Sequence, residues 1–73
     1  MTLANAHIGE TVRLVAIEGG THIRRRLADM GLSTGMEVKV ITGIEHGPII
    51  LSVKDSRLAI GRGMAEKIIV EKV

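Results

Sequence analysis

The chain contains no phenylalanine, tyrosine or tryptophan, and this absence excludes two common kinds of binding groove. Grooves that read proline-rich peptides are lined with aromatic side chains. Single-stranded nucleic acid is commonly held by stacking its bases on aromatic rings. We therefore expect neither a proline-motif reader nor a base-stacking protein, whatever the fold.

Cysteine is also absent, and no stretch of the sequence approaches the roughly 20 apolar residues of a membrane-spanning helix. The first absence excludes disulfides, thiolate nucleophiles and cysteine-ligated metals. The segment Met1–Gly9 lacks the basic start and apolar run of a signal peptide. Together these features predict a cytoplasmic protein that does not insert into a membrane.

Charge is nearly balanced, because the chain has 10 Lys and Arg residues and 8 Asp and Glu residues, which gives a net charge of +2. The sequence pI near 9.5 therefore reflects a small excess in a small protein. The positive charge is local, and the only basic run is Arg24, Arg25 and Arg26.

One segment has helical spacing. Ile23, Leu27 and Met30 recur so that they share one face of a helix, which predicts a helix over residues 21–30. Thr21 is expected to cap the start of this helix through its hydroxyl. Gly31 stands where helices commonly end on a left-handed residue, and Leu32 is expected to fold back onto Leu27.

Most of the remaining chain has the aliphatic patterning of strands. After an extended lead-in over residues 1–9, we expect strands at 10–17, 36–44, 49–53, 57–60 and 67–73, with a hairpin loop at 45–48, a tight reversal at 55–56 and a short helical turn at 61–65. About five short, mostly antiparallel strands with one helix after the first predict a mainly β, small barrel. Residues 1–73 are expected to form a single domain.

The order and spacing of these glycine and aliphatic positions resemble the ferrous-iron transport protein A (FeoA) family. The resemblance spans nearly the whole chain and rests on Gly9, Arg26-Leu27, Met30-Gly31-Leu32, Gly35, Val38, Gly47-Pro48, Leu58-Ala59-Ile60-Gly61, Ala65 and Ile68-Ile69-Val70. It implies an SH3-like barrel, a fold that also forms the C-terminal part of some iron-dependent repressors.

The resemblance also implies a function. Members of the family are small cytosolic proteins that support a membrane permease for Fe(II), and the family is broadly associated with transition-metal binding. We therefore expect a non-catalytic regulatory protein that binds the cytoplasmic GTP-binding region of the permease. The expected contacts are the exposed helix face and a neighbouring loop, namely Arg24, Arg25, Arg26, Glu45, His46 and Pro48.

Two interpretations of the arginine run remain open. Arg24 and Arg25 lie near the helix N-terminus, where the macrodipole disfavours exposed cations by about 0.3–1 kcal/mol each. Such a cost without visible compensation points to a partner-binding surface. The alternative is a solvated face on which Arg25 pairs with Asp29 four residues later.

A metal site receives weak support. His7, His22 and His46 are scattered, and the nearest acid–imidazole pairs are Glu45 with His46 and Glu18 with His22. We expect no required cofactor and no tight site in the isolated chain. Weak binding of a divalent transition metal such as Fe or Zn, or a site shared within a weak homo-oligomer, is the alternative.

Catalysis is not expected. Ser33, Ser52 and Ser56 have no nearby histidine or glycine-flanked turn, and Gly61-Arg62-Gly63 is too short for a phosphate-binding loop. The three internal methionines that could suggest soft-metal ligation are expected to fill the core instead. Two further functions stay open: a small basic nucleic-acid-binding barrel, which the low net charge opposes, and a transition-metal-sensing module.

Overall fold

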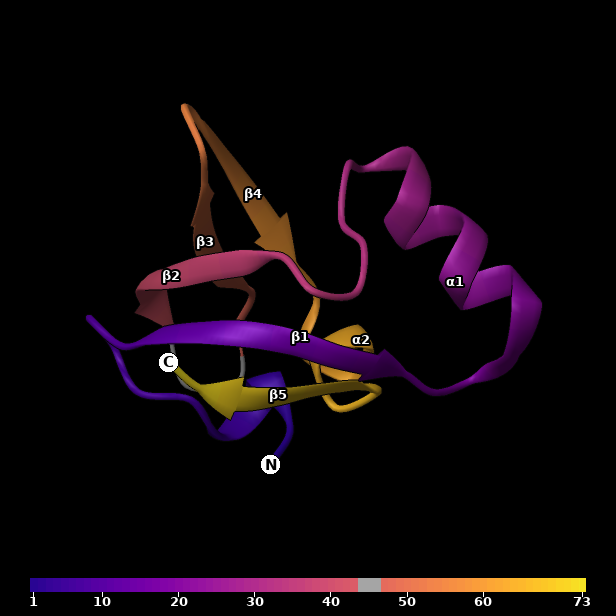
Figure 1. The fold of residues 1–73 in the computed structure, drawn as a ribbon, viewed down its shortest axis with the longest axis horizontal. Coiled ribbons are helices and arrows are strands. Elements are labelled where there is room, and N and C mark those ends of the chain that lie inside the picture. The colour runs from indigo at the N-terminus through magenta and orange to yellow at the C-terminus, as the bar shows by residue number, and fades with distance from the viewer. Residues whose placement is uncertain (44–46) are drawn as a thin grey trace.

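Five antiparallel strands form one curved sheet of order β4-β3-β2-β1-β5 (Figure 1). The computed structural model describes residues 1–43 and 47–73. The strands are β1 (Thr11–Ile17), β2 (Glu37–Gly43), β3 (Ile49–Val53), β4 (Ser56–Ile60) and β5 (Ile68–Lys72). The other elements of these described ranges are two α-helices, α1 (Gly20–Asp29) and α2 (Arg62–Ala65), and one 3-10 turn, η1 (Leu3–Asn5).

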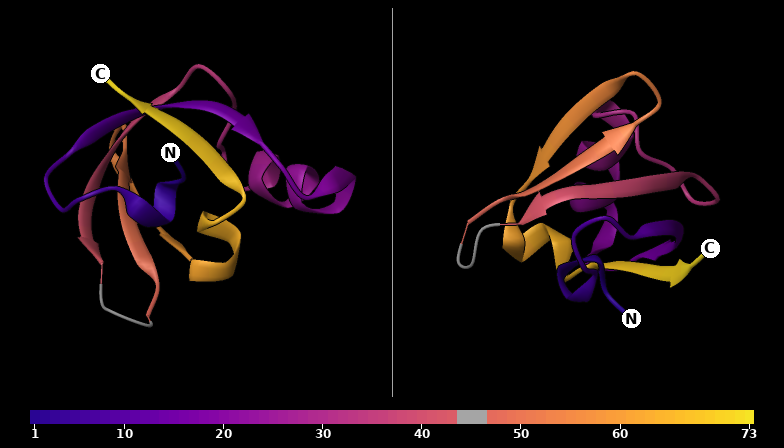
Figure 2. Two further views of the ribbon diagram at one scale, coloured as in Figure 1. Left: turned by 90° about the horizontal axis from the view of Figure 1, so that it is seen from below. Right: turned by 90° about the vertical axis from the view of Figure 1, so that its left-hand side faces the viewer.

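The sheet curls into a small barrel, which confirms the expected mainly β architecture (Figure 2). The pairing register shifts between Leu14 and Ala16 in β1 and again between Val40 and Thr42 in β2. Such irregularities bend a strand and increase its twist. In the curled sheet η1 and α2 lie on the concave side and contact each other, whereas α1 stands outside the barrel.

The buried core residues of the described ranges are all aliphatic. Inward residues alternate along the strands as the sequence predicts, with Val12 and Leu14 buried in β1 and Val38 and Val40 buried in β2. Within the described ranges no polar or charged side chain is buried. Met30, Met36 and Met64 pack against the core, as expected of gap-filling methionines.

The N-terminal segment departs from the expected extended lead-in. It forms η1, and Leu3 is fully buried. The Val70 amide donates to the Met1 carbonyl at 2.8 Å, and Gly9 donates to the Val40 carbonyl at 2.7 Å. The segment therefore runs from β5 to β2 and is hydrogen-bonded to both strands. The burial of Leu3 stabilises this position of an otherwise polar and alanine-rich stretch.

The expected end of α1 is confirmed. Gly31 has φ +92°, its amide donates to the Ala28 carbonyl at 2.9 Å, and Leu32 donates to the Leu27 carbonyl at 2.9 Å. This is the bonding pattern of a Schellman cap, which satisfies the last carbonyls of the helix. Leu32 is buried, as the fold-back onto Leu27 requires.

The expected start of α1 is wrong. The helix begins at Gly20, its N-cap is Gly19 at φ +103°, and no side chain caps it. Thr21 already lies inside the helix and is exposed. The chain reverses direction directly after β1, and only glycine adopts such positive φ values without strain, so the two glycines replace a hydroxyl cap.

The reversal between the third and fourth strands also shifts by one residue. Lys54 and Asp55 form the turn, with Lys54 at φ +54°, and Ser56 already belongs to β4. The short helical turn expected at 61–65 is confirmed as α2.

Replacing Leu27 by alanine tests the attachment of α1. Leu27 is the fully buried residue of this helix, so Leu27→Ala should lower the free energy of unfolding by about 2–5 kcal/mol. Urea denaturation of the two proteins measures the difference. Val15→Ala truncates an aliphatic side chain that is 47% exposed and is the matched control. Equal losses in both variants would show that α1 is not held by Leu27.

Replacing Gly31 by alanine tests the helix cap. An added Cβ would meet no atom within 4 Å, so the effect of Gly31→Ala reports only the positive φ. A left-handed non-glycine residue costs roughly 1–2 kcal/mol, and thermal unfolding should show that loss. Gly63→Ala, in α2 and equally open, should be neutral or slightly stabilising. A silent Gly31→Ala would contradict the cap.

Candidate docking surface

The exposed face of α1 is the candidate docking surface, and one buried residue positions it. Leu27 is buried, Ile23 and Met30 pack partly against the core, and the remaining side chains of α1 are exposed. Figure 1 shows α1 projecting from one end of the barrel beside the end of β1. The helix therefore presents its polar face away from the sheet.

Arg24 has a local structural role. Its Nε donates to the carbonyl of Ile17, the last residue of β1, at 3.1 Å. This hydrogen bond engages the guanidinium, and the start of α1 at Gly20 makes Arg24 the fifth helical residue, beyond the first turn where the macrodipole acts. The expectation of an uncompensated cost is therefore wrong at Arg24, and this side chain ties α1 to the strand before it.

Arg25 and Arg26 are both exposed. In the described chain Arg25 forms no ion pair with Asp29, so the pairing expected in the alternative interpretation is absent. Arg26 lies in the last turn of the helix, where a cation interacts favourably with the macrodipole. Arg25 is thus the residue of the run that neither a contact nor its helix position explains.

Of the expected loop contacts, Pro48 is described and lies away from the helix (Figure 2). Glu45 and His46 fall outside the described residues. Pro48 is exposed and directly precedes β3. The ends of β2 and β3 that flank this connection lie at the opposite end of the barrel from α1 (Figure 2). The expectation that Pro48 neighbours α1 is therefore wrong.

Strand direction explains the separation. Because β1 and β2 are antiparallel, with Arg13 opposite Glu37, the end of β1 lies beside the start of β2. The helix follows the end of β1, so it lies near the start of β2 and far from its end. Docking through α1 and docking through Pro48 are two separate possibilities.

A pocket of about 370 Å³ lies beneath the N-terminal segment. Its apolar walls include Ala4, Ile8, Val40 and Ile49, and Arg62 also lines it. The Nε of Arg62 donates to the Gly47 carbonyl at 3.2 Å, so this side chain links α2 to the residue before Pro48. The pocket is lined mainly by aliphatic groups and shows no arrangement of catalytic side chains among the residues described.

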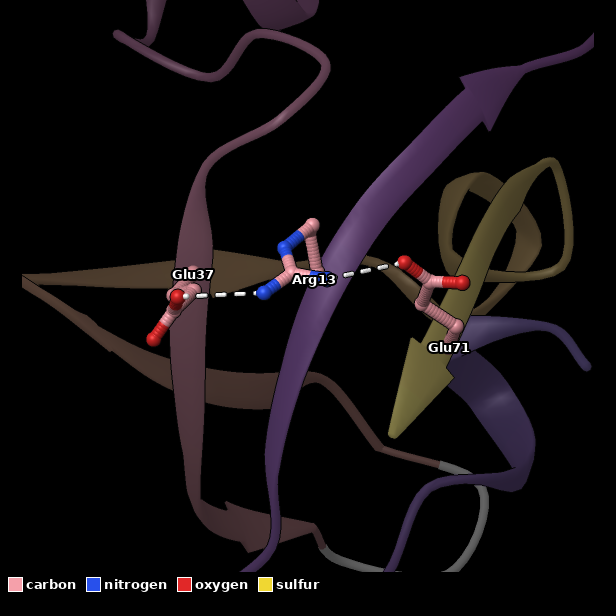
Figure 3. A network of polar contacts seen from close by, with 3 residues as sticks. All are labelled: Arg13, Glu37 and Glu71. Atoms are coloured by element: carbon pink, nitrogen blue, oxygen red, sulfur yellow. Dashed lines mark hydrogen bonds and ion pairs between the residues drawn. The ribbon is translucent and has the colours of Figure 1, made fainter. Parts of the chain in front are cut away.

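The sequence analysis missed a polar network on the outer face of the sheet. Arg13 Nη1 lies 3.0 Å from Glu71 Oε1, and Arg13 Nη2 lies 3.4 Å from Glu37 Oε2 (Figure 3). Hydrogen bonds to these carboxylates, that to Glu71 first, raise the pKa of Arg13. Arg13 thus links three neighbouring strands, β5, β1 and β2, although all three side chains are substantially exposed.

Glu10 fastens the turn that leads into β1. The His7 amide donates to Glu10 Oε1 at 2.9 Å, and Lys72 Nζ lies 3.5 Å from Glu10 Oε2. The hydrogen bond from the His7 amide, assisted by the charge of Lys72, lowers the pKa of the Glu10 carboxyl below its ordinary value of 4.5. This carboxylate therefore joins the N-terminal segment to the C-terminal strand.

The described residues contain no cluster of three or more histidine, aspartate or glutamate side chains placed to hold a metal ion. Glu18 and His22 are exposed and form no ion pair across the Gly19-Gly20 turn. His7 instead lies beside Glu10, with Nδ1 3.9 Å from the carboxylate.

Comparison with known proteins places the chain in a family. The model of the FeoA domain matches residues 1–72. A protein of Methanocaldococcus jannaschii, provisionally named Fe(2+) transport protein A, is 46% identical over 69 residues, which cover 94% of this chain and 83% of that protein. The chain belongs to the FeoA domain family.

Solved structures agree with this FeoA assignment. The crystal structure of an iron uptake regulatory protein (FeoA) superposes with a TM-score of 0.93 at 37% identity, covering 100% of this chain and 97% of that one. A manganese-dependent transcriptional repressor superposes with a TM-score of 0.91 at 21% identity over 41% of its length, which shows a shared fold alone. The expected SH3-like barrel is thereby confirmed.

The FeoA chain has no helix, in its described part, of the length and apolarity needed to span a membrane. The longest, α1, has 10 residues and a largely charged surface.

The pH dependence of stability tests the role of Glu10. Because its pKa is lower in the folded protein, its contribution to stability is present above pH 4.5 and is lost as the pH falls through the folded value. Wild type should therefore lose more stability than Glu10→Gln between about pH 6 and about pH 3. Urea titrations across this range measure it, with Glu66→Gln as the exposed-carboxylate control. Parallel curves for wild type and Glu10→Gln would refute the assignment.

Proposed function

We propose that this FeoA-domain protein is a non-catalytic accessory protein of ferrous-iron uptake that acts in the cytoplasm by binding the GTP-binding region of the Fe(II) permease. The observation that carries the proposal is the family assignment, because relatives bear the names Fe(2+) transport protein A and iron uptake regulatory protein. The small aliphatic barrel fits an interaction module, since none of the polar side chains in the described ranges is buried.

The contact surface that we propose is the exposed face of α1, centred on Arg25 and Arg26. Arg24 is engaged by the Ile17 carbonyl, so its guanidinium contributes less to a partner. An acidic partner surface would be attracted by the remaining two cations, which speeds association by electrostatic steering. Two exposed arginines neutralise few phosphates, so the same surface would hold nucleic acid weakly and with strong dependence on salt.

The Fe(II) ion is cargo of the permease in this proposal. The protein requires no resident metal or other cofactor, and the scattered histidines would give at most weak contacts to a divalent ion such as Fe or Zn. Pro48, at the other end of the barrel, is retained as a second, independent contact candidate.

Charge reversal on α1 tests the contact surface. Arg25→Glu should leave the fold intact, because the side chain is exposed and lies in the middle of α1, outside the first and last turns where the macrodipole acts. It should weaken binding to the purified cytoplasmic domain of the permease by roughly fivefold to a hundredfold at low salt. Biolayer interferometry measures the dissociation constant.

The matched control is Lys54→Glu, which makes the same charge change in the turn between β3 and β4. It should bind the permease domain nearly as wild type does. Equal affinity of Arg25→Glu and wild type would remove α1 from the contact surface, whereas equal weakening by both variants would reduce the effect to net charge.

A further inference from the structure

The two edge strands of the sheet are treated differently. The outer edge of β5 is covered by the N-terminal segment, through the Val70 amide to the Met1 carbonyl at 2.8 Å and a bridge between Thr2 and Ile69. At the other edge β4 pairs with β3 and with no second strand of the described chain. Within the described ranges, residues 57–59 make no backbone hydrogen bond outside the sheet. An uncovered edge is a ready template for another strand.

Two residues of β4, Arg57 and Ala59, have backbone groups that point to the open edge. The hairpin closes at Val53 opposite Ser56 around a two-residue turn, and a closing pair of this kind exchanges both hydrogen bonds. Pairs then alternate, so Leu58 bonds to Leu51 across the hairpin while Arg57 and Ala59 turn their N–H and C=O groups to the open edge. Both are exposed, and the small side chain of Ala59 leaves room for a neighbour.

The one charged residue of β4 is Arg57, and a second cation lies in its cross-strand row. Lys39 lies opposite Ser52, and Ser52 lies opposite Arg57, so one cross-strand row carries two cations and no carboxylate. Lys39 and Arg57 are exposed and form no ion pair in the described part of the chain. The balanced row elsewhere on the sheet, Arg13 between two glutamates, shows the contrast.

We propose that the open edge of β4 binds an extended, acidic segment of another protein as an additional antiparallel strand. The backbone groups of Arg57 and Ala59 supply the main-chain hydrogen bonds. An Asp or Glu opposite Arg57 would sit about 5 Å away between Cα atoms, which continues the row with the missing negative charge. This surface is distinct from α1, and the proposal does not require the acidic segment to belong to the permease.

Charge favours such a partner over a second copy of this chain. A symmetric pairing of two β4 strands about Leu58 would bring two Arg57 side chains to diagonal positions without a carboxylate between them. Each chain also carries a net charge of +2. An acidic strand would bond to the same backbone groups, and its carboxylates would attract Arg57.

Selection from a peptide library tests the proposal. Random peptides of about ten residues, displayed on phage, are selected on the immobilised full chain and, in parallel, on Arg57→Glu. We expect the wild type to enrich peptides in which Asp or Glu alternates with β-branched residues, and Arg57→Glu to lose that enrichment. Absence of enrichment, or enrichment without acidic residues, would overturn the proposal.

Backbone recognition is tested with the most enriched peptide. In a ¹⁵N NMR titration, shifts should concentrate on β3 and β4. N-methylation of the peptide amides that face β4 should weaken binding by roughly tenfold. Ala59→Pro removes one outward donor at an edge position that tolerates proline and should weaken binding similarly. Shifts centred on α1, or equal binding of the N-methylated peptide, would contradict strand addition even if Ala59→Pro does not fold.

The free protein offers an independent check. The amides of Arg57 and Ala59 should exchange with solvent rapidly, while those of Leu58 and Ile60 are protected by β3. Analytical ultracentrifugation should show a monomer under the same conditions. A dimer with protected Arg57 and Ala59 amides would show that a second copy occupies this edge and would overturn the proposal.

Discussion

The fold of this protein depends on burying aliphatic side chains, because the sequence supplies neither aromatic rings nor cysteines for disulfides. Leu, Ile and Val residues from all five strands meet in the barrel, and segments outside the sheet join by inserting a residue of the same kind. Leu27 attaches α1 and Leu3 attaches the N-terminal segment. A domain of this size has a small free energy of unfolding. Each of these leucines therefore determines whether its segment stays packed against the barrel.

This division leaves the polar groups for the surface, where they are arranged unevenly. On one part of the outer face Arg13 is neutralised by Glu37 and Glu71. On α1 and along β4 cations stand without carboxylate partners in the described chain. Exposed cations that form no ion pair within the protein can attract an acidic partner. The surfaces that carry them are therefore where the FeoA domain would bind acidic proteins. Under our proposals the fold supplies rigidity, and α1 and the edge of β4 supply the charged contacts to a partner.

Much of the fold was predictable because its signals are local. Alternation places Val12, Leu14, Val38 and Val40 inside, and the cap of α1 follows from Gly31 and Leu32. What escaped prediction depends on contacts between distant segments. Leu3 stands alone among polar and small residues, so no periodicity marks it as core. The bond from Arg24 to Ile17 depends on the sharp exit from β1, and the partners of Arg13 depend on strand register. The separation of α1 from Pro48 follows from antiparallel pairing, which the sequence does indicate.

We propose that this FeoA-domain protein functions by docking through charged residues on a preformed surface. Isothermal titration calorimetry of the full chain against the purified GTP-binding domain of the Fe(II) permease, at several salt concentrations without added metal, tests it most directly. The account predicts saturable binding whose dissociation constant rises steadily with salt, because exposed charges are screened. Absence of binding at low salt, or an affinity that does not respond to salt, would contradict it.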